Sequence, residues 1–150
     1  MWVVRAGREA MFADEWRTDG FVALDEEFEA GDLVAVGEAG LMAKVGSPAQ
    51  RIYAGQLISF AFAIQVGEIV VVPQPPKRRT YLVGEVVGGY EHVSPYPPSG
   101  PHRRRVRWLG DLDRENLSGW AVKTLGSVPA LFRPSKVEVE LRELITELQP

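Results

Sequence analysis

The stretch SPAQRIYAGQLISFAFAIQVGEIVVVP, residues 47–73, contains a complete helix signal followed by a strand signal. Ser47 is a favoured N-cap residue, and Pro48 suits the first helical position because its missing N–H would be unbonded there in any case. Apolar residues recur at helical spacing through 49–65, and a glycine ends the pattern. The β-branched run that follows, 68–73, predicts a buried strand. The expected core face of the helix carries Ile52, Leu57, Phe60, Ala61 and Ile64.

Two further strand patterns follow this unit. Residues 80–93 indicate a long strand, in which Gly88-Gly89 predicts a bulge or sharp bend. Residues 103–109 alternate arginines with a second set of side chains, which is typical of a half-buried strand with one basic face. The connections between these strands are short, as in antiparallel hairpins.

The first part of the chain is expected to open with a strand at 2–6, a short helix at 8–18 and a second strand at 21–24. An acidic loop follows at 25–32. Two glycines, Gly37 and Gly40, interrupt residues 33–45, which we expect to form a strand-like piece and then a short helix.

Short elements dominate the last third. We expect brief helices at 111–117 and 118–125, a short strand at 128–133 and a terminal helix at 136–148. The terminal helix has a narrow apolar stripe, which either packs on the domain or contacts a partner or a further domain. Its residues are Leu141, Leu144, Ile145 and Leu148.

Length and composition favour one domain, residues 1–134, with residues 135–150 as an appended helix. Hydrophobic residues make up 45% of the 150, so a core can be buried. This order of elements predicts an α+β fold: a small mixed or antiparallel β-barrel flanked by short helices. The chain has no cysteine, which excludes disulfides and thiolate metal sites and suits a reducing cytoplasm. No apolar run reaches the roughly 18 residues of a membrane span.

Charge is unevenly distributed. The net charge is −3, yet residues 77–107 carry seven basic and two acidic side chains, a net charge of +5. Six of the seven lie in two triplets, 77–79 and 103–105. This pattern predicts a surface that faces phosphates, with a plain solvated face as the alternative.

Catalytic motifs are missing. The two histidines, His92 and His102, have no partner at metal-ligand spacing, and no cofactor loop is present. Acidic residues cluster between Asp25 and Glu29, a pattern that usually marks a solvated loop. We therefore expect a protein that is not an enzyme and that holds no metal or cofactor. An enzyme with magnesium-dependent activity at Asp25 or Glu27 is a third-ranked alternative.

Aromatic residues are the remaining candidates for a binding site. Trp2 and Trp108 lie in strand patterns and are expected in the core. Trp16 and Trp120 lie on short helices, where core and binding roles are evenly balanced. Aromatic faces are the groups that sandwich an extruded base.

Several blocks of the sequence, in their order and spacing, resemble the N-terminal domains of prokaryotic Mrr-like and other modification-dependent restriction proteins. The resemblance covers about 2–134. Its blocks are Trp2–Gly7, Gly20–Leu24, Tyr53–Phe60, Val66–Pro73, Tyr81–Val86, Pro101–Trp108 and Thr124–Ser127.

The resemblance implies a PUA-like fold related to EVE and YTH domains, a small β-barrel with helices around it. Such domains bind nucleic acid and flip a modified base, N6-methyladenine or a modified cytosine, into an aromatic pocket. In restriction and antiviral defence systems this module accompanies a nuclease or nucleotide-driven effector, which would join at the terminal helix. Related sequences commonly carry a tryptophan just after the second strand, where this chain has Asp25-Glu26-Glu27.

These arguments predict two sets of residues in this chain that bind a partner. The partner is most simply double-stranded DNA. Stacking on the base is expected from Trp16 and Tyr53, and acceptance of an exocyclic amine from Asp25. The expected base-binding residues are Arg5, Gly7, Trp16, Asp25 and Tyr53, and the expected phosphate-binding residues are Lys77, Arg78, Arg79, Arg103 and Arg104. The alternative function is a protein-interaction module that uses the apolar stripe of the terminal helix and binds no base.

Overall fold

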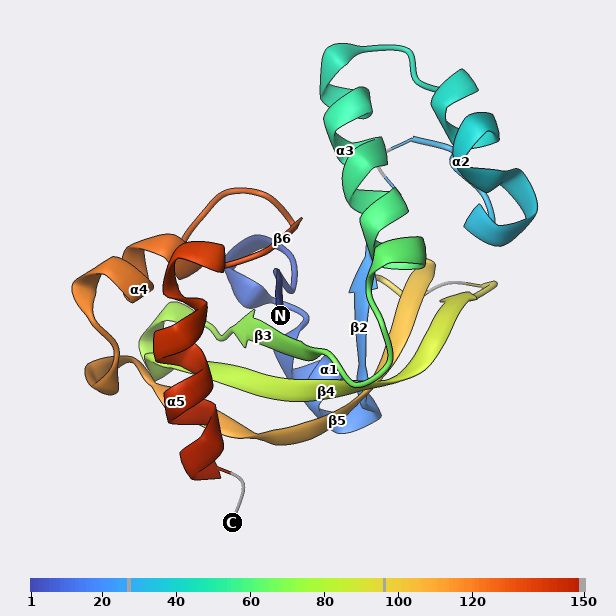
Figure 1. Ribbon diagram of the computed structural model, residues 1–150. Coiled ribbons are helices and arrows are strands. Elements are labelled where there is room, and N and C mark those ends of the chain that lie inside the picture. The colour runs from blue at the N-terminus through green and yellow to red at the C-terminus, as the bar shows by residue number, and fades with distance from the viewer. Residues whose placement is uncertain (27, 96, 149–150) are drawn as a thin grey trace.

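In the described part of the chain, six strands form one sheet that curls into half of a barrel (Figure 1). The computed structural model describes residues 1–26, 28–95 and 97–148. The order across the sheet is β2-β5-β4-β3-β1-β6. The strands are β1 (Trp2–Val4), β2 (Phe21–Leu24), β3 (Ile69–Pro73), β4 (Thr80–His92), β5 (His102–Asp113) and β6 (Leu131–Phe132).

Strand pairing is mixed, as expected. β1 pairs with β3 in parallel, and the other neighbours pair antiparallel. The long β4–β5 pair has two register shifts, at Val83/Gly84 and between Val86 and Tyr90. The second shift contains Gly88-Gly89, so the expected bulge is confirmed. Bulges increase local twist, which lets this long pair bend around the core.

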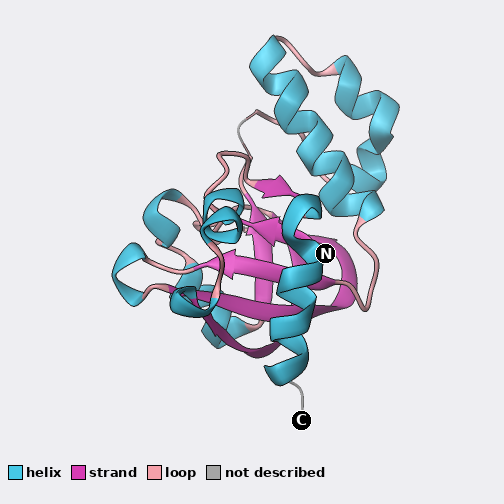
Figure 2. Ribbon diagram, turned by 60° about the vertical axis from the view of Figure 1, so that its left-hand side comes forward, coloured by secondary structure: helices cyan, strands magenta, loops and turns pink. Residues whose placement is uncertain are grey.

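The helices cover the sheet unevenly. α2 (Leu33–Ala43) and α3 (Pro48–Ile58) form a hairpin that projects beyond the sheet, whereas α5 (Glu138–Leu148) lies across one of its faces (Figures 1 and 2). α1 is Ala13–Asp19 and α4 is Gly119–Leu125. Single turns of 3₁₀-helix occur at Arg8–Ala10, Pro76–Arg78, Arg114–Asn116 and Ser135–Val137, and a π-helical turn at Ser59–Ala63 continues α3.

The helix and the strand predicted within residues 47–73 are confirmed. Ser47 Oγ accepts a hydrogen bond from the Gln50 N–H at 3.2 Å, and Pro48 opens α3. The prediction that Ile52 lies on the core face of this helix is wrong, because Ile52 is 68% exposed. Each residue advances about 100° around a helix, so five residues place Ile52 roughly 140° from Leu57. Tyr53 and Ala54 occupy the inward positions instead.

Three local expectations are wrong. Residues 33–45 contain no strand, because the Asp32 side chain caps a helix there by accepting from the Val34 N–H at 3.0 Å. The break in that helix is at Gly37, which has φ 74°. The helix expected at 8–18 is divided, since positive φ angles of 53° at Glu9 and 57° at Ala10 end the first turn. In place of the helix expected at 111–117, residues 111–113 end β5 and residues 114–116 form one 3₁₀ turn.

The core has two parts, one on each face of the sheet. β3 supplies both, because Val70 and Val72 belong to one cluster and Val71 to the other. The second cluster includes Leu141 and Ile145 of α5. The remaining stripe residues of α5, Leu144 and Leu148, pack against the same cluster. The apolar stripe of the terminal helix therefore packs on the sheet.

A buried polar chain ties the α2–α3 hairpin to the sheet. The Leu33 N–H donates to the Tyr90 hydroxyl at 3.1 Å, and that hydroxyl lies 2.7 Å from His102 Nδ1. The Tyr90 hydroxyl either donates to Nδ1 or accepts from it, according to which ring nitrogen of His102 carries the proton. Nε2 faces a Glu26 oxygen at 3.4 Å.

Burial holds this histidine neutral. His102 has no exposed surface, and this burial, followed by the charge of His92, lowers its pKa to about 4. The contact with Glu26 is therefore a neutral polar contact at pH 7, although it would be an ion pair if the ring were protonated.

The pH dependence of stability tests this arrangement. In the unfolded chain His102 takes up a proton near pH 6.5, but in the folded chain only near pH 4. The unfolded state therefore binds more protons between these values, and the free energy of unfolding falls as pH drops from about 6.5 to about 4. The expected loss is up to about 3 kcal/mol.

Urea unfolding at several pH values in this range measures the effect. We expect H102Q to lose most of this pH dependence and H92Q to keep most of it, so that carboxylate titration cancels in the comparison. A slope in H102Q equal to that of the wild type would contradict the assignment.

Candidate functional site

A pocket of about 340 Å³ opens where the ends of β1 and β2 meet α3. All five residues expected to bind a base line it, although they come from four separate segments. Arg5 and Gly7 follow β1, Trp16 lies on α1, Asp25 follows β2, and Tyr53 lies on α3. The other lining residues are Arg8, Phe12, Ala23, Leu24, Ser99, Val128 and Ala130.

Gly7 allows the chain to turn into the pocket wall. Its φ of 76° and ψ of −173° lie in a region that is essentially restricted to glycine. A Cβ at this position would also stand 2.6 Å from the Phe12 ring. Gly7 therefore lets the half-buried Phe12 pack against the backbone beside the pocket. Sequence reasoning missed Phe12, although its position one helical turn before Trp16 was a usable signal.

Gly100 brings in a residue that sequence reasoning also missed. It has φ 114°, and a Cβ there would lie 2.2 Å from the Leu24 carbonyl oxygen. This close approach seats the β4–β5 connection against the end of β2 and places Ser99 in the pocket wall. Ser99 is buried, and its hydroxyl has no hydrogen-bond partner among the described residues.

Asp25 and Tyr53 form one side of the rim. The Tyr53 hydroxyl donates to the Asp25 backbone carbonyl, which fixes the start of the acidic loop to α3. The Asp25 carboxylate is exposed and accepts from the Glu26 N–H at 2.7 Å. Asp25 is the single carboxylate among the described lining residues, so it is the acceptor that an amine-bearing ligand would meet.

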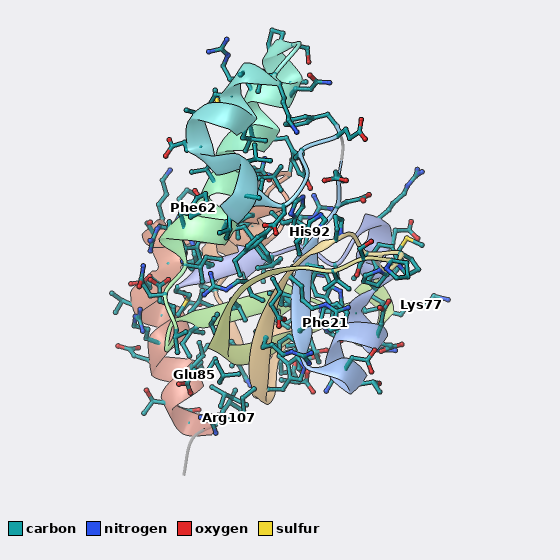
Figure 3. The ribbon with its side chains drawn as sticks, turned by 90° about the vertical axis from the view of Figure 1, so that its right-hand side faces the viewer. Phe21, Phe62, Lys77, Glu85, His92 and Arg107 are labelled. Atoms are coloured by element: carbon teal, nitrogen blue, oxygen red, sulfur yellow. The ribbon has the colours of Figure 1, made fainter. Side chains whose placement is uncertain are left out.

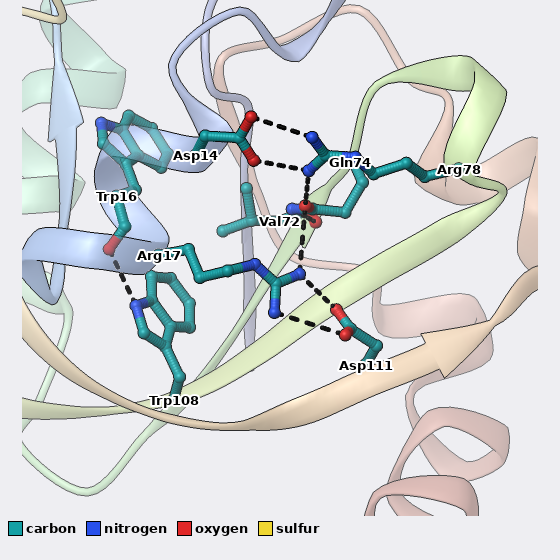
Figure 4. Close-up of polar contacts among 8 residues, drawn as sticks. All are labelled: Asp14, Trp16, Arg17, Val72, Gln74, Arg78, Trp108 and Asp111. Carbon is teal, nitrogen blue, oxygen red and sulfur yellow. Dashed lines mark hydrogen bonds and ion pairs between the residues drawn. The ribbon is translucent and has the colours of Figure 1, made fainter.

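Trp16 needs a correction. Its side chain has no exposed surface, so its ring offers no face on which a base could stack. Its backbone carbonyl accepts the Trp108 indole N–H at 2.8 Å, which fixes α1 to β5 (Figure 4). The indole N–H of Trp16 has no partner among the described residues. Trp16 is therefore a wall residue with an unsatisfied donor.

Arg104 also needs a correction, because it is 2% exposed and cannot contact a phosphate. Its guanidinium donates to the carbonyls of Phe60 at 3.0 Å, Ile64 at 2.9 Å and Gly88 at 3.0 Å. Burial lowers the pKa of Arg104. Arg104 therefore has a structural role, because its hydrogen bonds join the end of the α3 segment to the bulge of β4.

The two basic triplets do not form one surface. Thr80, next to the first triplet, pairs with Asp113, whereas Arg103 pairs with Glu91 at the opposite end of the β4–β5 pair. Arg78 binds Asp14 through two contacts of 2.5 and 2.8 Å (Figure 4), and this bond holds the pKa of Asp14 low. Lys77 and Arg79 are exposed.

The remaining cations of β5 are also engaged. Arg103 lies over the Phe21 ring at 3.9 Å. Arg105 approaches Glu91 at 3.6 Å, and Arg107 binds Glu85 at 2.7 Å. Figure 3 shows Arg107 and Lys77 on different parts of the surface. A continuous phosphate-facing strip is therefore not assembled from these residues.

The acidic loop, residues 25–32, has a defined contact at Glu26. Glu26 accepts from the Gly31 N–H at 3.0 Å, while Glu27 lies outside the described residues. Within the described ranges, no three metal-ligating side chains come together as a group that could hold an ion. The helices of those same ranges include none with the length and hydrophobicity needed to cross a bilayer.

Fold and site together define an α+β domain with a half-barrel sheet and a small pocket at the ends of two strands. The chain belongs to the family described as "Domain of unknown function (DUF8426)", whose model matches residues 29–131. No curated protein and no solved structure matches the chain significantly.

The assignment of Arg104 to structure is testable by unfolding. We expect R104M to lose roughly 3 kcal/mol of stability, because three carbonyls, two of them in buried hydrogen bonds, lose a charged donor. R105M is the matched control, because Arg105 is exposed and its ion pair is long; its loss should stay within about 0.5 kcal/mol. Equal urea midpoints for the two variants would contradict the buried role.

Proposed function

We propose that this chain is a PUA-like, non-catalytic specificity domain that binds DNA and takes a modified base into the pocket. The observation that carries the proposal is the convergence in one small pocket of Arg5, Gly7, Trp16, Asp25 and Tyr53 with two buried, unpartnered polar groups. N6-methyladenine and modified cytosines are the proposed ligands. The proposal places the domain in a restriction or defence system, beside a fused or associated nuclease or nucleotide-driven effector.

The size of the pocket supports a single ring system as the ligand. Small-molecule sites span roughly 300 to 1,000 Å³, and this one is near the lower limit at about 340 Å³. A base inside a duplex cannot reach such a pocket, so it must be flipped out of the stack. Phe12, which is only partly buried, offers the pocket an aromatic side chain.

The polar groups of the wall suit the edge of a base. An unsatisfied buried donor costs about 1–3 kcal/mol, and a ligand that supplies the missing partner recovers this cost. The Trp16 N–H can only donate, whereas the Ser99 hydroxyl can donate or accept. The Asp25 carboxylate can accept from an exocyclic amine. The Ser99 hydroxyl and the Asp25 carboxylate would read the edge of the base, while Arg8, exposed at the rim, would approach a phosphate.

Fluorescence anisotropy with short duplexes tests the proposal. The panel contains unmodified DNA and DNA with N6-methyladenine, 5-methylcytosine or 5-hydroxymethylcytosine, at two salt concentrations. We expect a preference for one modified duplex that persists at the higher salt. S99A and D25N should each reduce that preference about 10-fold, the value of one lost hydrogen bond to a buried or charged group.

E29Q is the control, because Glu29 is an exposed acid of the same loop that does not line the pocket. It should bind every duplex as the wild type does. Equal binding of all duplexes by the wild type would refute base reading. Cleavage of a labelled duplex in magnesium, lost in D25N, would refute the non-catalytic role.

A further inference from the structure

A second pocket, of about 390 Å³, lies beside the edge strand β6. Its wall comes from α4 and from the segment that links β6 to α5. Three of its lining residues are cations, and none of those described is a carboxylate, although the chain as a whole is acidic. The lining residues are Trp120, Lys123, Thr124, Ser127, Phe132, Arg133, Ser135 and Lys136.

Trp120 is the unusual member of this wall. Its side chain is 53% exposed, whereas the other three tryptophans are buried or half-buried. The ammonium groups of Lys123 and Lys136 lie 5.9 and 5.7 Å from the centre of its ring. The third cation, Arg133, is held over the Trp2 ring at 4.0 Å. An accessible indole is thus surrounded by positive charges that no carboxylate of the pocket neutralises.

Stacking faces and cations in one groove are the two components of single-strand nucleic-acid binding. A base stacks on an aromatic ring regardless of its identity, while lysine and arginine neutralise the adjacent phosphates. An acidic peptide would use the cations but would leave the indole without a partner. The combination therefore favours a nucleotide over an acidic side chain.

The two pockets share one segment of chain. Val128 and Ala130 line the first pocket, whereas Ser127, Phe132 and Arg133 line the second. The Arg5 guanidinium donates to the Val128 carbonyl at 2.7 Å and so fastens this segment to the end of β1. Residues of the segment 127–133 therefore contribute to both pockets.

We propose that the second pocket binds a neighbouring nucleotide of the same DNA strand, with its base on Trp120 and its phosphate between Lys123 and Lys136. The pairing of the two pockets on one strand rests on the proposed function of the first. Binding of DNA at the second pocket has its own observations and its own test.

The test measures the affinity of the full chain for an unmodified single-stranded thymidine oligonucleotide and for the duplex panel over a range of salt. The double variant K123S/K136S should bind at least 10-fold more weakly. Its slope of log affinity against log salt should be smaller by about two, since two phosphate contacts are lost. W120A should bind about 10-fold more weakly, and W120F should retain most of the affinity.

R105S/R107S is the matched control, because it removes two exposed positive charges from β5, outside both pockets. It should change affinity less than twofold. Equal weakening by the two double variants would overturn the proposal, because binding would then follow net charge alone. Wild-type affinity in W120A would also overturn it, as would displacement of the oligonucleotide by a polyglutamate peptide of equal charge.

The two proposals fail in different ways. Variants of the second pocket should lower the affinity for all duplexes alike and leave the preference for a modified base unchanged, whereas S99A should do the reverse. A wild type with no modified-base preference, but with the expected loss in K123S/K136S, would refute the proposed function and keep the second pocket as a DNA site.

Discussion

Val70 and Val72 of β3 point into the core cluster on one face of the sheet, and Val71 points into the cluster on the other. Burial on both faces requires that both be covered, so α3 and its extension pack on one side and α4 and α5 on the other. The β4–β5 pair curls around the core because its bulges allow it to bend. The ends of β1 and β2 are left open by this arrangement, and the first pocket forms there.

Close backbone approaches shape that opening. Gly7 and Gly100 occupy conformations or spacings that a Cβ would not permit, and together they bring the segments after β1 and before β5 to the end of β2. Among the described residues, the polar groups at the pocket, Ser99 and Trp16, are then buried without partners. Such unsatisfied groups are uncommon in folded proteins.

Basic residues that are adjacent in the sequence do not form one basic surface, and the reason is geometric. The arginine triplet 103–105 lies in a strand, whose side chains alternate between faces, so Arg104 is directed into the core while Arg103 and Arg105 are not. The exposed arginines of β5 then meet acidic residues on β4. The cations around Trp120 are scattered in the sequence between 123 and 136, and only the meeting of α4 with the segment after β6 gathers them.

The sequence by itself determined the local elements that depend on nearest neighbours: the cap at Ser47, the buried strand β3, the glycine bulge in β4 and the strand 21–24. Resemblance to other sequences also selected the five residues that the fold brings into one pocket. Tertiary structure alone decided which aromatic is exposed, because Trp16 and Trp120 lie on short helices of similar pattern and only their packing differs. It also decided the roles of Arg104 and Ser99, since burial and long-range hydrogen bonding depend on contacts between segments far apart in the chain.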